Sequence, residues 1–514
     1  MGGSTDHASD DWGIFGEPIF DSPSARALSR VGVVDVGSNS VRLVVFDGAA
    51  RSPAYFFNEK LMCGLGAGLA ETGKLNPEGR VRALEALKRF ALLAKGMGAS
   101  PMTVVATAAM REAEDGPAFV DEVLAETGLK MWVIDGEEEA RLTAQGVLLG
   151  WPDANGLVCD IGGSSMELAV VADGQVGERV TSSLGPLKLA GLPGGKKALK
   201  SYIDDTLKTL VDQVGRNDRL FLVGGSWRAI ARLDMHRRGY PLLVQHEYRM
   251  SRRSVLDTVK WIGEQDLDQV RLETGTSAAR MALVPIAAKV LKRLVYTVKP
   301  KEIFISSYGI REGMLYEQMS DEQRLRDPLI EACRFAEATT SRIPGFGRRL
   351  YQFVRPLFAK LPDERRRLVK AACLLHDTAW RAHPDYRHEV CFDNATRANL
   401  GGLDHQGRVF LGLALLHRYK NSRAGSRFDP LFTLLSDKDI DQAEILGKAM
   451  RFGAMFTTEG PDDLAKLRHY PKKQVLELIL TPQAEDLFGE VAEARFQSLA
   501  SALGSETRVR VMAS

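Results

Sequence analysis

Short runs of β-branched and other apolar residues alternate with amphipathic segments along residues 31 to about 318. The runs VGVVDVG at 31–37 and VRLVVFDG at 41–48 have the composition of buried strands. The same reasoning predicts a strand, a helix and a further strand at Thr103–Ala106, Pro117–Thr127 and Met131–Ile134. Strands that alternate with helices predict an α/β sheet whose faces are covered by helices.

The first long amphipathic segment carries start and stop signals for a helix. Asn76 is a suitable N-cap, Pro77 suits the first helical position, and Gly96 suits the end. Helical spacing places four apolar residues on one face, which we expect to be buried: Val81, Leu84, Leu87 and Ala91. The pattern therefore predicts a helix from Pro77 to about Gly96.

A repeat is the most informative feature of the chain. The segments VVDVGSNSVRLVVFDG, at 33–48, and VCDIGGSSMELAVVADG, at 158–174, align without gaps at five positions: Asp35 with Asp160, Gly37 with Gly162, Ser40 with Ser165, Leu43 with Leu168, and Val45 with Val170. Each copy reads as a strand, a turn, a second strand and an Asp-Gly hairpin signal. The repeat predicts two similar domains that face each other, at 31–142 and 143–318.

The two ends of the chain have different patterns. Residues 1–30 hold five acidic side chains among Gly, Ser and Pro, a composition that predicts a disordered tail. After Met314 the alternation stops and long helical patterns follow, such as DPLIEACRFAEATTSR. Residues 319–514 are therefore predicted to form an all-helical region.

Composition and charge narrow the class of protein. The 514 residues carry 68 basic and 66 acidic side chains, so the net charge of +2 gives no general attraction to nucleic acid. No apolar run reaches the roughly 18 residues of a spanning helix. The five cysteines are odd in number and lack metal-ligand spacing, as in reduced cytosolic proteins. We expect a cytoplasmic protein without a membrane partner or a specific nucleic-acid partner.

The repeated turn has the form D-x-G-[SG]-x-S, which suits a phosphate site. Its glycine lets backbone N–H groups approach an oxyanion, and its carboxylate stands at a strand end where it could hold a metal ion. One such turn alone could equally be an ordinary hairpin. Two copies facing one cleft predict a clamp for a phosphate chain with its Mg²⁺.

Two other glycine turns follow predicted strands. Gly224, Gly225 and Ser226 lie between the apolar run LFLV and the segment WRAIARL, where an anion could meet a helix N-terminus. The segment FISSYGIREGML, at 304–315, has Gly309 at its bend and Arg311 near the start of a helix. Contact between domains explains this second turn as well as ligand binding does.

Three consecutive glutamates begin the segment GEEEARLTAQGVLLG between the two repeats. Acidic residues in a first helical turn complement the helix dipole, but three exceed what the dipole requires. One of them could act as a base toward a water that attacks phosphorus. Arg111 and Arg141 are candidate phosphate ligands, and the alternative for each is a surface ion pair with Glu112, Glu114 or Glu138.

Six ordered motifs resemble the exopolyphosphatase and guanosine pentaphosphate phosphatase family. They are VVDVGSNSVRL, VVATAAMREA, GEEEARL, VCDIGGSSMEL, VGGSWRAIARL and SSYGIREGMLY, and they cover about residues 31–320. The family belongs to the actin, hexokinase and Hsp70 superfamily. The resemblance implies two duplicated ribonuclease H-like (actin-like ATPase) domains followed by a helical C-terminal region resembling HD phosphohydrolases.

The resemblance also implies roles for individual residues. The family's catalytic glutamate corresponds to Glu139, and Asp160 and Glu167 correspond to acids that support Mg²⁺ and the catalytic water. Asp35 would join Asp160 and Glu167 as a metal ligand, and Arg111 matches a phosphate-contacting arginine. The two phosphate loops would comprise Gly37, Ser38, Asn39 and Ser40 in the first copy, and Gly162, Gly163, Ser164 and Ser165 in the second. This sequence departs from the family pattern at Ser164 and Met166, which replace a glycine and a threonine.

The HD resemblance rests on the segment LLHDTAW at 374–380. Five of the nine histidines fall nearby, at His376, His383, His388, His405 and His417. An HD metal site also needs an upstream histidine, and none occurs between His246 and His376. We therefore favour a degenerate structural or binding domain over a second metal hydrolase.

The region from Ser341 to Pro430 is basic in a nearly neutral chain. It holds 17 Lys and Arg against eight Asp and Glu, an excess of nine positive charges. A basic run such as Arg365 to Arg367 is usually a solvated helix face. The excess could instead line a channel for a long polyanion, joined by Arg348, Arg349 and Arg355.

The sequence-based hypothesis is a Mg²⁺-dependent exopolyphosphatase that releases orthophosphate from inorganic polyphosphate, with K⁺ as a candidate activator. The closest alternative is hydrolysis of guanosine pentaphosphate to tetraphosphate, an activity of the stringent response, and both could coexist. A sugar kinase or chaperone-like ATPase, and a non-catalytic sensor of guanosine tetraphosphate or polyphosphate, are alternatives from other classes. The resemblance also implies a homodimer formed through the helical region.

Overall fold

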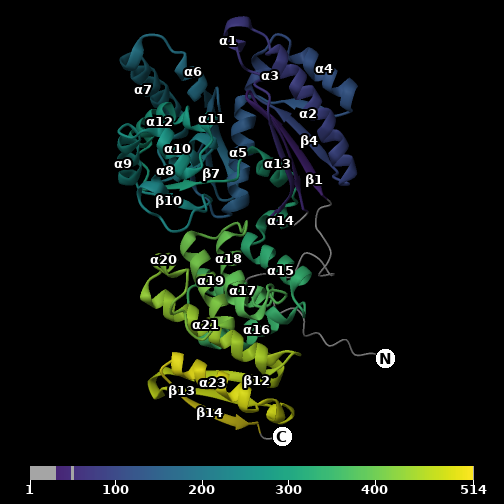
Figure 1. Ribbon diagram of the computed structural model, residues 1–514, viewed down its shortest axis with the longest axis vertical. Coiled ribbons are helices and arrows are strands. Elements are labelled where there is room, and N and C mark those ends of the chain that lie inside the picture. Colours follow the sequence, from purple (N-terminus) through teal and green to yellow (C-terminus); the bar gives the residue numbers. More distant parts are fainter. Residues whose placement is uncertain (1–29, 48–50, 513–514) are drawn as a thin grey trace. The chain divides into compact units, whose positions relative to one another are not determined.

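The computed structural model describes residues 30–47 and 51–512, and the chain divides into two compact units (Figure 1). Their described parts are the N-terminal unit, residues 30–47 and 51–325, and the C-terminal unit, residues 326–512. The division falls after Leu325, whereas the sequence pattern placed it after residue 318. Except for Arg30, the predicted tail lies outside the described residues.

The first lobe of the N-terminal unit is built on a five-stranded sheet with the order β3-β2-β1-β4-β5. Its strands are β1 (Val31–Val36), β2 (Ser40–Phe46), β3 (Tyr55–Met62), β4 (Met102–Ala106) and β5 (Met131–Val133). β1 pairs antiparallel with β2 and parallel with β4. Its helices are α1 (Leu69–Thr72), α2 (Pro77–Gly96), α3 (Ala108–Glu112) and α4 (Gly116–Thr127). The elements predicted for residues 31–134 are thus confirmed.

Helix α2 has the predicted ends but a different buried face. The Asn76 side chain accepts a hydrogen bond from the Gly79 backbone N–H, and the helix ends at Gly96. Val81 is 58% exposed, so the predicted face is wrong there. Gly79 lies against the backbone of Cys63 and Gly64, where a Cβ would come within 2.9 Å of an oxygen. This close contact turns another row inward: Ala83, Ala86, Leu87, Phe90 and Ala94.

The second lobe carries a six-stranded sheet with the order β10-β11-β9-β6-β7-β8. Its strands are β6 (Gly156–Ile161), β7 (Met166–Ala172), β8 (Gln175–Ser182), β9 (Arg219–Val223), β10 (Tyr248–Met250) and β11 (Glu302–Ile305). Its helices are α6 (Pro186–Ala190), α7 (Gly195–Val214), α8 (Gly225–Arg237), α9 (Arg252–Ile262), α10 (Leu267–Thr274), α11 (Ala278–Met281) and α12 (Val284–Val298). Apart from β10, this sheet has the strand order and the parallel and antiparallel pairings of the first.

The two predicted Asp-Gly hairpins differ. Asp173 and Gly174 have φ of 52° and 72°, as the tight turn between β7 and β8 requires. In the first copy Gly48 lies outside the described residues, and the Asp47 N–H donates to Ala54 O at 2.8 Å. The connection from β2 to β3 is therefore longer than a two-residue turn.

Helices α5 (Gly136–Gly150) and α13 (Ile310–Glu317) form a layer shared by the two lobes, and α14 (Asp321–Leu325) follows them (Figure 1). One hydrophobic core joins both helices to both sheets, with Val33 and Val44 from the first and Val158 and Phe221 from the second. The outer faces of the sheets pack into two separate cores. Both central strands are therefore buried on both faces, which explains their nearly continuous apolar sequences.

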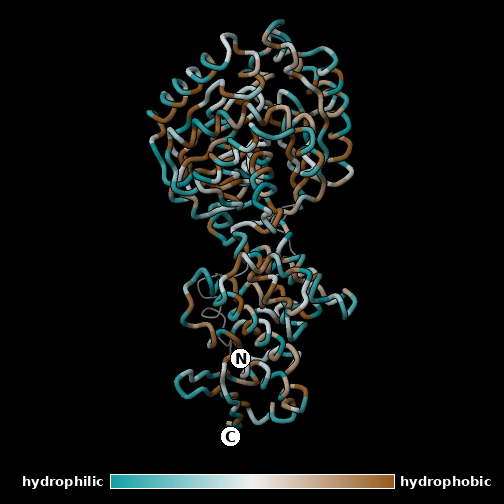
Figure 2. Tube along the Cα trace, turned by 60° about the vertical axis from the view of Figure 1, so that its left-hand side comes forward, coloured by the Kyte–Doolittle hydropathy of each residue, from teal (hydrophilic) through white to brown (hydrophobic). Residues whose placement is uncertain are grey.

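The C-terminal unit is mainly helical but contains a sheet. Its helices are α15 (Pro328–Thr340), α16 (Phe346–Val354), α17 (Asp363–Leu375), α18 (Arg387–Arg397), α19 (His405–Tyr419), α20 (Asp429–Phe432), α21 (Asp437–Phe456), α22 (Pro461–Leu464) and α23 (Glu490–Ala502), with 3-10 turns η2 (Arg355–Phe358), η3 (Pro384–Tyr386), η4 (Pro471–Lys473) and η5 (Pro482–Leu487). Figure 2 shows apolar and polar stretches alternating along both units. Within the described residues, none of the helices combines the length and the apolar character that a membrane span requires.

The all-helical prediction for residues 319–514 is wrong near the C-terminus. A three-stranded sheet of order β12-β13-β14 is formed by Ala465–Tyr470, Val475–Leu480 and Glu506–Val511. All six residues of β13, VLELIL, are buried. Because a short apolar run has no alternation, its sequence does not distinguish a buried strand from a buried helix.

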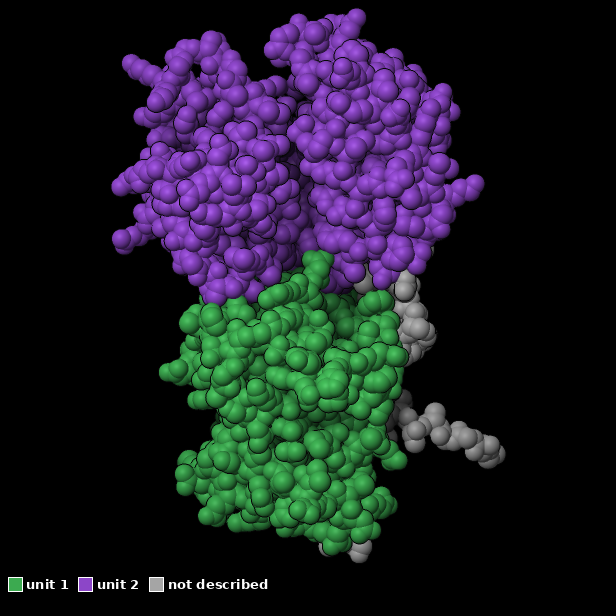
Figure 3. Space-filling model, viewed as in Figure 1, with its two compact units in different colours: residues 1–25, 326–514 green, residues 26–325 purple. Residues whose placement is uncertain are grey.

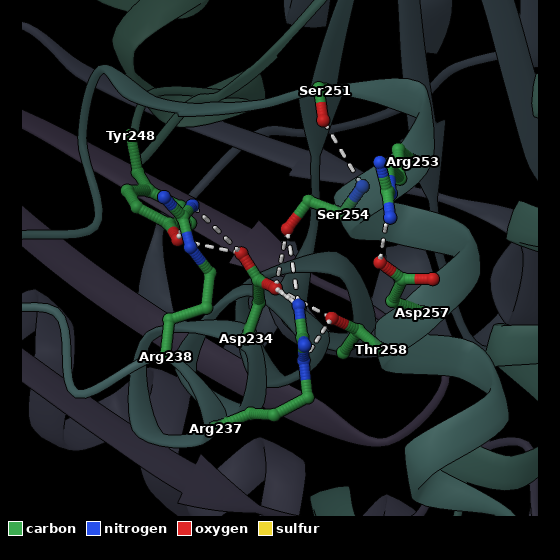
Figure 4. A network of polar contacts seen from close by, with 9 residues as sticks. All are labelled: Asp234, Arg237, Arg238, Tyr248, Ser251, Arg253, Ser254, Asp257 and Thr258. Atoms are coloured by element: carbon green, nitrogen blue, oxygen red, sulfur yellow. Dashed lines mark hydrogen bonds and ion pairs between the residues drawn. The ribbon is translucent and has the colours of Figure 1, made fainter.

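A buried carboxylate joins three elements of the second lobe (Figure 4). Asp234 of α8 is fully buried, and it accepts hydrogen bonds from Tyr248 at 2.6 Å, Thr258 at 2.5 Å and Ser254 at 2.7 Å. Arg237 and Arg238 add ion pairs at 2.9 and 3.5 Å. Burial acts to raise the pKa of Asp234, but these hydrogen bonds outweigh it and lower the pKa.

We expect Asp234→Asn to lower the free energy of unfolding by about 2 to 4 kcal/mol, since a charged acceptor of several bonds is lost. The depressed pKa means that the stabilisation is fully present above the unfolded value of about 3.9 and is lost as pH falls through the folded pKa. Urea denaturation at pH 7 and pH 5 should therefore give the same difference. The exposed, ion-paired Asp257 provides the control Asp257→Asn, which should change stability little.

Helices α5 and α13 cross at two glycines. A Cβ on Gly313 would lie 1.7 Å from Leu142 O, and one on Gly146 would lie 2.2 Å from Gly309 O. Any side chain at either position would therefore force the helices apart.

We expect Gly313→Ala to destabilise the N-terminal unit by about 3 kcal/mol, because backbone atoms must move to admit the methyl group. Gly96→Ala is the matched control, since no atom lies within 4 Å of its added Cβ. That change should be neutral or slightly stabilising by the higher helix propensity of alanine. Equal effects of the two substitutions in thermal unfolding would contradict the close crossing.

Candidate functional site

The N-terminal unit is hollowed between its two lobes (Figure 3). Side-chain alternation in β1 brings Asp35 to this side of the first sheet. Val34 and Val36 belong to the outer core, whereas Val33 belongs to the core shared with α5 and α13. Because alternate residues share a face, Asp35 lies on the face of Val33, toward the shared layer.

The second sheet presents its acidic residues in the same way. Val158 belongs to the shared core, and Asp160 follows it by two residues along β6. Ala169 of β7 also belongs to the shared core, and Glu167 precedes it by two residues. Asp160 and Glu167 are direct cross-strand partners. The alternation thus carries the acids of both repeats to the same layer.

The two predicted phosphate turns have the same backbone hydrogen bond. The Gly37 N–H donates to Ser40 O at 3.0 Å, and the Gly162 N–H donates to Ser165 O at 3.0 Å. In the first turn, Ser38 O accepts from the Gly66 N–H, and Asn39 O accepts from the N–H groups of Cys63 and Gly64. The equivalence seen in the sequence therefore extends to backbone geometry.

Neighbouring segments hold the second turn in place. A Cβ on Gly185 would lie 2.1 Å from the carbonyl carbon of Ser164, so the chain before α6 passes directly against the turn. The Leu187 N–H donates to Gly163 O at 2.9 Å. Met166, one of the two positions at which the sequence departs from the pattern that the resemblance implies, is fully buried.

The third glycine turn lies next to Asp160. Gly224, at φ 113°, ends the loop after β9, and Gly225 and Ser226 begin α8. A Cβ on Gly224 would meet Ile161 O at 2.6 Å and Asp160 Oδ1 at 3.0 Å. Only glycine therefore fits here, and the structure brings this turn to the carboxylate of the second repeat.

Glu139 differs from the two glutamates before it. Glu137 is exposed, and Glu138 binds Arg141 at 2.7 Å. The Oε2 atom of Glu139 is buried and has no hydrogen-bond partner among the described residues. Burial raises the pKa of Glu139 well above its usual value, and Glu167, Asp160 and Asp35 add to the rise. A carboxylate with a raised pKa is suited to act as a general base.

Two threonines contact the other acids, and neither was singled out from the sequence. Thr143, one helical turn beyond Glu139, donates to Asp160 Oδ2 at 2.8 Å, and Thr181 donates to Glu167 Oε1 at 3.2 Å. Burial raises the pKa of Asp160, and burial together with Asp160 raises the pKa of Glu167 to about 8. The site therefore concentrates negative charge that the protein compensates only in part.

The two candidate arginines have different surroundings. Arg141 binds Glu138 at 2.7 Å and Glu317 at 2.8 Å, so the ion-pair alternative is correct for it. Arg111 donates to Ile134 O at 2.6 Å, and its charge acts to lower the pKa values of Glu139 and Glu167. Its neighbour Glu112 pairs instead with Lys188, at 3.1 Å.

Further cations cluster around Arg311, which lies beside Asp35. Arg311 of α13 binds Asp35 at 3.2 Å. Four other cations lie within electrostatic range of Arg311 or of one another and were missed from the sequence: Arg42, Lys60, Arg228 and Arg280. Burial and the neighbouring arginines lower the pKa of Arg228 to about 10. Arg42 lies two residues beyond Ser40 and opposite Lys60 on β3, so strand alternation after the first turn is a signal that could have identified both.

The carboxylates of the site are suited to Mg²⁺ by their chemistry, but their arrangement limits how many of them could bind one ion. The carboxylates are hard oxygen ligands, and Glu139 and Glu167 each have a buried Oε2 atom without a partner in the described chain. No group of three or more His, Cys, Asp or Glu among those residues is arranged to hold a metal ion, and this applies to Asp35, Asp160 and Glu167. One or two of these carboxylates with water and substrate oxygens is the arrangement Mg²⁺ commonly takes.

In the C-terminal unit, the two residues of the HD motif, His376 and Asp377, already have partners within the protein. Asp377 accepts hydrogen bonds from the backbone and guanidinium of Arg342, at 2.5 to 3.2 Å. His376 is buried, its Nδ1 lies 2.8 Å from Cys373 O, and burial and then Arg418 lower its pKa to about 3. The other histidines of the cluster are distributed over separate elements: His383 before η3, His388 on α18, and His405 and His417 at the two ends of α19.

Many cations of the basic region have partners within the C-terminal unit. Arg349 binds Asp462 at 2.6 Å, Arg365 binds Asp439 at 2.8 Å, and Arg367 binds Asp327. Arg408 is buried and donates to carbonyl oxygens at the end of α18 and just beyond it. Much of the local charge excess therefore stabilises this unit, and the whole excess is not available to a polyanion.

Comparisons with known proteins match both units. The profile of the Ppx/GppA phosphatase family matches residues 44–322, and that of the exopolyphosphatase C-terminal domain matches residues 333–509. Exopolyphosphatase 1 of Mycobacterium tuberculosis is 26% identical over 310 residues, covering 57% of this chain and 89% of that protein. Guanosine-5'-triphosphate,3'-diphosphate pyrophosphatase of Photobacterium profundum is 27% identical over 306 residues, covering 56% and 59%.

Solved structures share the fold of the N-terminal unit. The Aquifex aeolicus Ppx/GppA phosphatase, at 22% identity, matches with a TM-score of 0.50 and covers 57% of this chain and all of that one. An exopolyphosphatase from Cytophaga hutchinsonii, at 21% identity, has a TM-score of 0.51 and covers 57% and 99%. Since the family profile spans more than half of the sequence, the chain belongs to the Ppx/GppA phosphatase family.

Proposed function

We propose that the protein is an exopolyphosphatase that hydrolyses the terminal phosphoanhydride of inorganic polyphosphate. The observation that carries the proposal is the buried Oε2 atom of Glu139, which has no hydrogen-bond partner within residues 30–47 and 51–512. This carboxyl group has a raised pKa and lies among the acids of two equivalent glycine turns. The mycobacterial relatives named exopolyphosphatase support the substrate class. The segment GEEEAR between the two repeats is not a feature that a sugar kinase or a chaperone-like ATPase requires.

In the proposed mechanism the two turns and Arg111 bind the terminal phosphates. Backbone N–H groups of the turns and the third turn at Gly224 would contact phosphate oxygens, and Arg111 would neutralise part of their charge. Glu139 would take the proton of the attacking water at its buried Oε2 atom. Thr143 and Thr181 would fix the orientations of Asp160 and Glu167.

The proposed cofactor is Mg²⁺, held by Asp35, Asp160 and Glu167 or by two of them together with substrate. When bound, the ion would neutralise charge on the phosphate oxygens and on the clustered acids. Arg311 already occupies one side of Asp35, which favours Asp160 and Glu167 as the principal ligands. Stimulation by K⁺ remains part of the proposal without a residue assigned to it.

Hydrolysis of guanosine pentaphosphate is the second candidate function. The five clustered cations, Arg42, Lys60, Arg228, Arg280 and Arg311, offer more positive charge than one terminal phosphate requires. They would suit either successive phosphates of a polymer or a nucleotide with phosphates at two positions. The relative from Photobacterium profundum supports this reading, which would connect the protein to the stringent response.

The remaining parts of the proposal concern architecture and assembly. The matching strand order of the two sheets supports a duplicated, actin-like pair of domains. The His376–Asp377 pair supports descent of the C-terminal unit from an HD-like domain that has lost metal binding. We further propose a cytoplasmic homodimer, formed through the C-terminal unit.

We expect Glu139→Gln to lower the rate of orthophosphate release from long-chain polyphosphate by roughly 10² to 10⁴, the usual contribution of a general base. Glu137→Gln, on the exposed side of the same helical turn, is the matched control and should retain the wild-type rate. Unchanged release by the Glu139 variant would refute the assignment. Guanosine pentaphosphate, assayed in parallel, would become the preferred substrate if it alone were hydrolysed, and tight binding without turnover would indicate a sensor.

Removal of divalent cations should abolish phosphate release, and addition of Mg²⁺ should restore it. Without the ion, the acids near Glu139 repel the charge of the incoming phosphate, so we expect weaker substrate binding as well as slower hydrolysis. Phosphate release and substrate binding are measured in EDTA and after titration with Mg²⁺. Full activity in EDTA would exclude the proposed cofactor.

A further inference from the structure

Four arginines of the C-terminal unit, from three helices and one loop, are linked pairwise by electrostatic range. Arg418 lies in the last turn of α19, Arg451 on α21, Arg495 on α23, and Arg342 just after α15. Helix α21 packs against both α19 and α23. Arg418 is within electrostatic range of Arg342 and Arg451, and Arg451 is within range of Arg495.

Arg418 is a buried cation whose Nε lacks an acceptor in the described part of the chain. The residue is only 6% exposed. Over residues 30–47 and 51–512, no oxygen accepts a hydrogen bond from its Nε. Within the same ranges its guanidinium forms no ion pair, and its contact is with the ring of the adjacent Tyr419, 4.8 Å from the ring centroid. A buried charge without a hydrogen-bonding partner is rare and costly in a folded protein.

A second buried arginine on the same helix shows what is missing. Arg408, 1% exposed, donates to Ala398 O at 2.7 Å, Leu400 O at 2.7 Å and Thr396 O at 3.4 Å. Among the described residues, carbonyl oxygens thus accept hydrogen bonds from one buried guanidinium of α19 and none accepts from the other. The buried Nε of Arg418 therefore remains an unused donor there.

The nearby carboxylate does not compensate for this. Asp377 acts on the charge of Arg418, but its oxygens already accept four hydrogen bonds from Arg342. His376 is neutral, because burial and Arg418 hold its pKa at about 3. Arg451 donates to the uncharged amide oxygen of Asn421, at 3.2 Å. The group therefore keeps an excess of positive charge.

We propose that Arg418, together with Arg342 and Arg451, binds a phosphate-type oxyanion in the C-terminal unit. A tetrahedral oxyanion accepts paired hydrogen bonds from guanidinium groups, and it would supply both the acceptors and the negative charge that Arg418 lacks. The ligand is either free orthophosphate or one phosphate group of a longer chain. The inference concerns binding alone, so it stands whether or not the N-terminal unit hydrolyses polyphosphate.

The test uses the full-length chain carrying Glu139→Gln, in EDTA, so that added phosphates are not consumed. Calorimetric titrations with orthophosphate and with tripolyphosphate are compared with and without Arg418→Met. We expect one class of sites to weaken roughly 10- to 100-fold when the guanidinium is removed. Comparable weakening for both probes assigns the site to free phosphate, and markedly tighter tripolyphosphate binding assigns it to a chain.

Stability supplies a readout that a purely structural role would not produce. Without the anion, Arg418→Met should leave the melting temperature unchanged or raise it, because an unpaired buried charge is removed. The rise in melting temperature caused by orthophosphate should shrink in the same variant. Arg397→Met removes an equal charge from an exposed side chain of the same unit, which pairs with Asp393 at 3.2 Å, and should change neither quantity.

A second variant covers failure of Arg418→Met to fold. Arg451→Met alters a half-buried side chain and should weaken the same class of sites to a smaller extent. The proposal is overturned if anion binding is unchanged in the variants that fold. It is also overturned if Arg418→Met lowers the melting temperature equally with and without orthophosphate, since the guanidinium would then be structural.

Discussion

The close crossing of α5 and α13 is the contact on which the N-terminal unit depends. Two glycines allow the helix backbones to approach to a distance that no side chain would permit. The same two helices carry groups of the site, since Glu139 lies one turn before Leu142 on α5 and Arg311 lies two residues before Gly313 on α13. The position of the candidate base relative to Asp35 and its arginine is therefore set by packing between helices, and the cleft inherits its geometry from a hydrophobic core.

Electrostatics then determines what this cleft can hold. Carboxylates from both repeats and from α5 are brought together with few cations close to Glu139 and Glu167, while a separate cluster of arginines and a lysine lies near Asp35. Such a separation of charge costs stability in the empty protein and is reduced by a polyanion that arrives with its own cation. The C-terminal unit contains a smaller example of the same condition at Arg418.

Sequence patterns predicted the parts of this molecule that depend on local signals. The strands, the caps of α2 and the paired turns at Gly37 and Gly162 follow from turn chemistry and from the repeat. The contacts of Thr143 and Thr181 were not predictable, because they depend on how a helix and a neighbouring strand face a third element. The clustered cations come from five separate segments, and strand alternation gave a local signal for only two of them, Arg42 and Lys60. The buried face of α2 and the strand β13 were misjudged for the related reason that tertiary packing overrides periodicity.

The alternation of side chains along β1 and β6 has a consequence for how this chain can vary. Each strand sends one set of residues to an outer core and the other set, including its aspartate, to the shared layer. An apolar residue exchanged for another of similar volume leaves this sorting intact. Insertion or deletion of a single residue before the aspartate would exchange the two sets, burying a carboxylate among valines and presenting valine to the cleft. Related sequences should therefore differ freely in composition along these strands and almost never in their length.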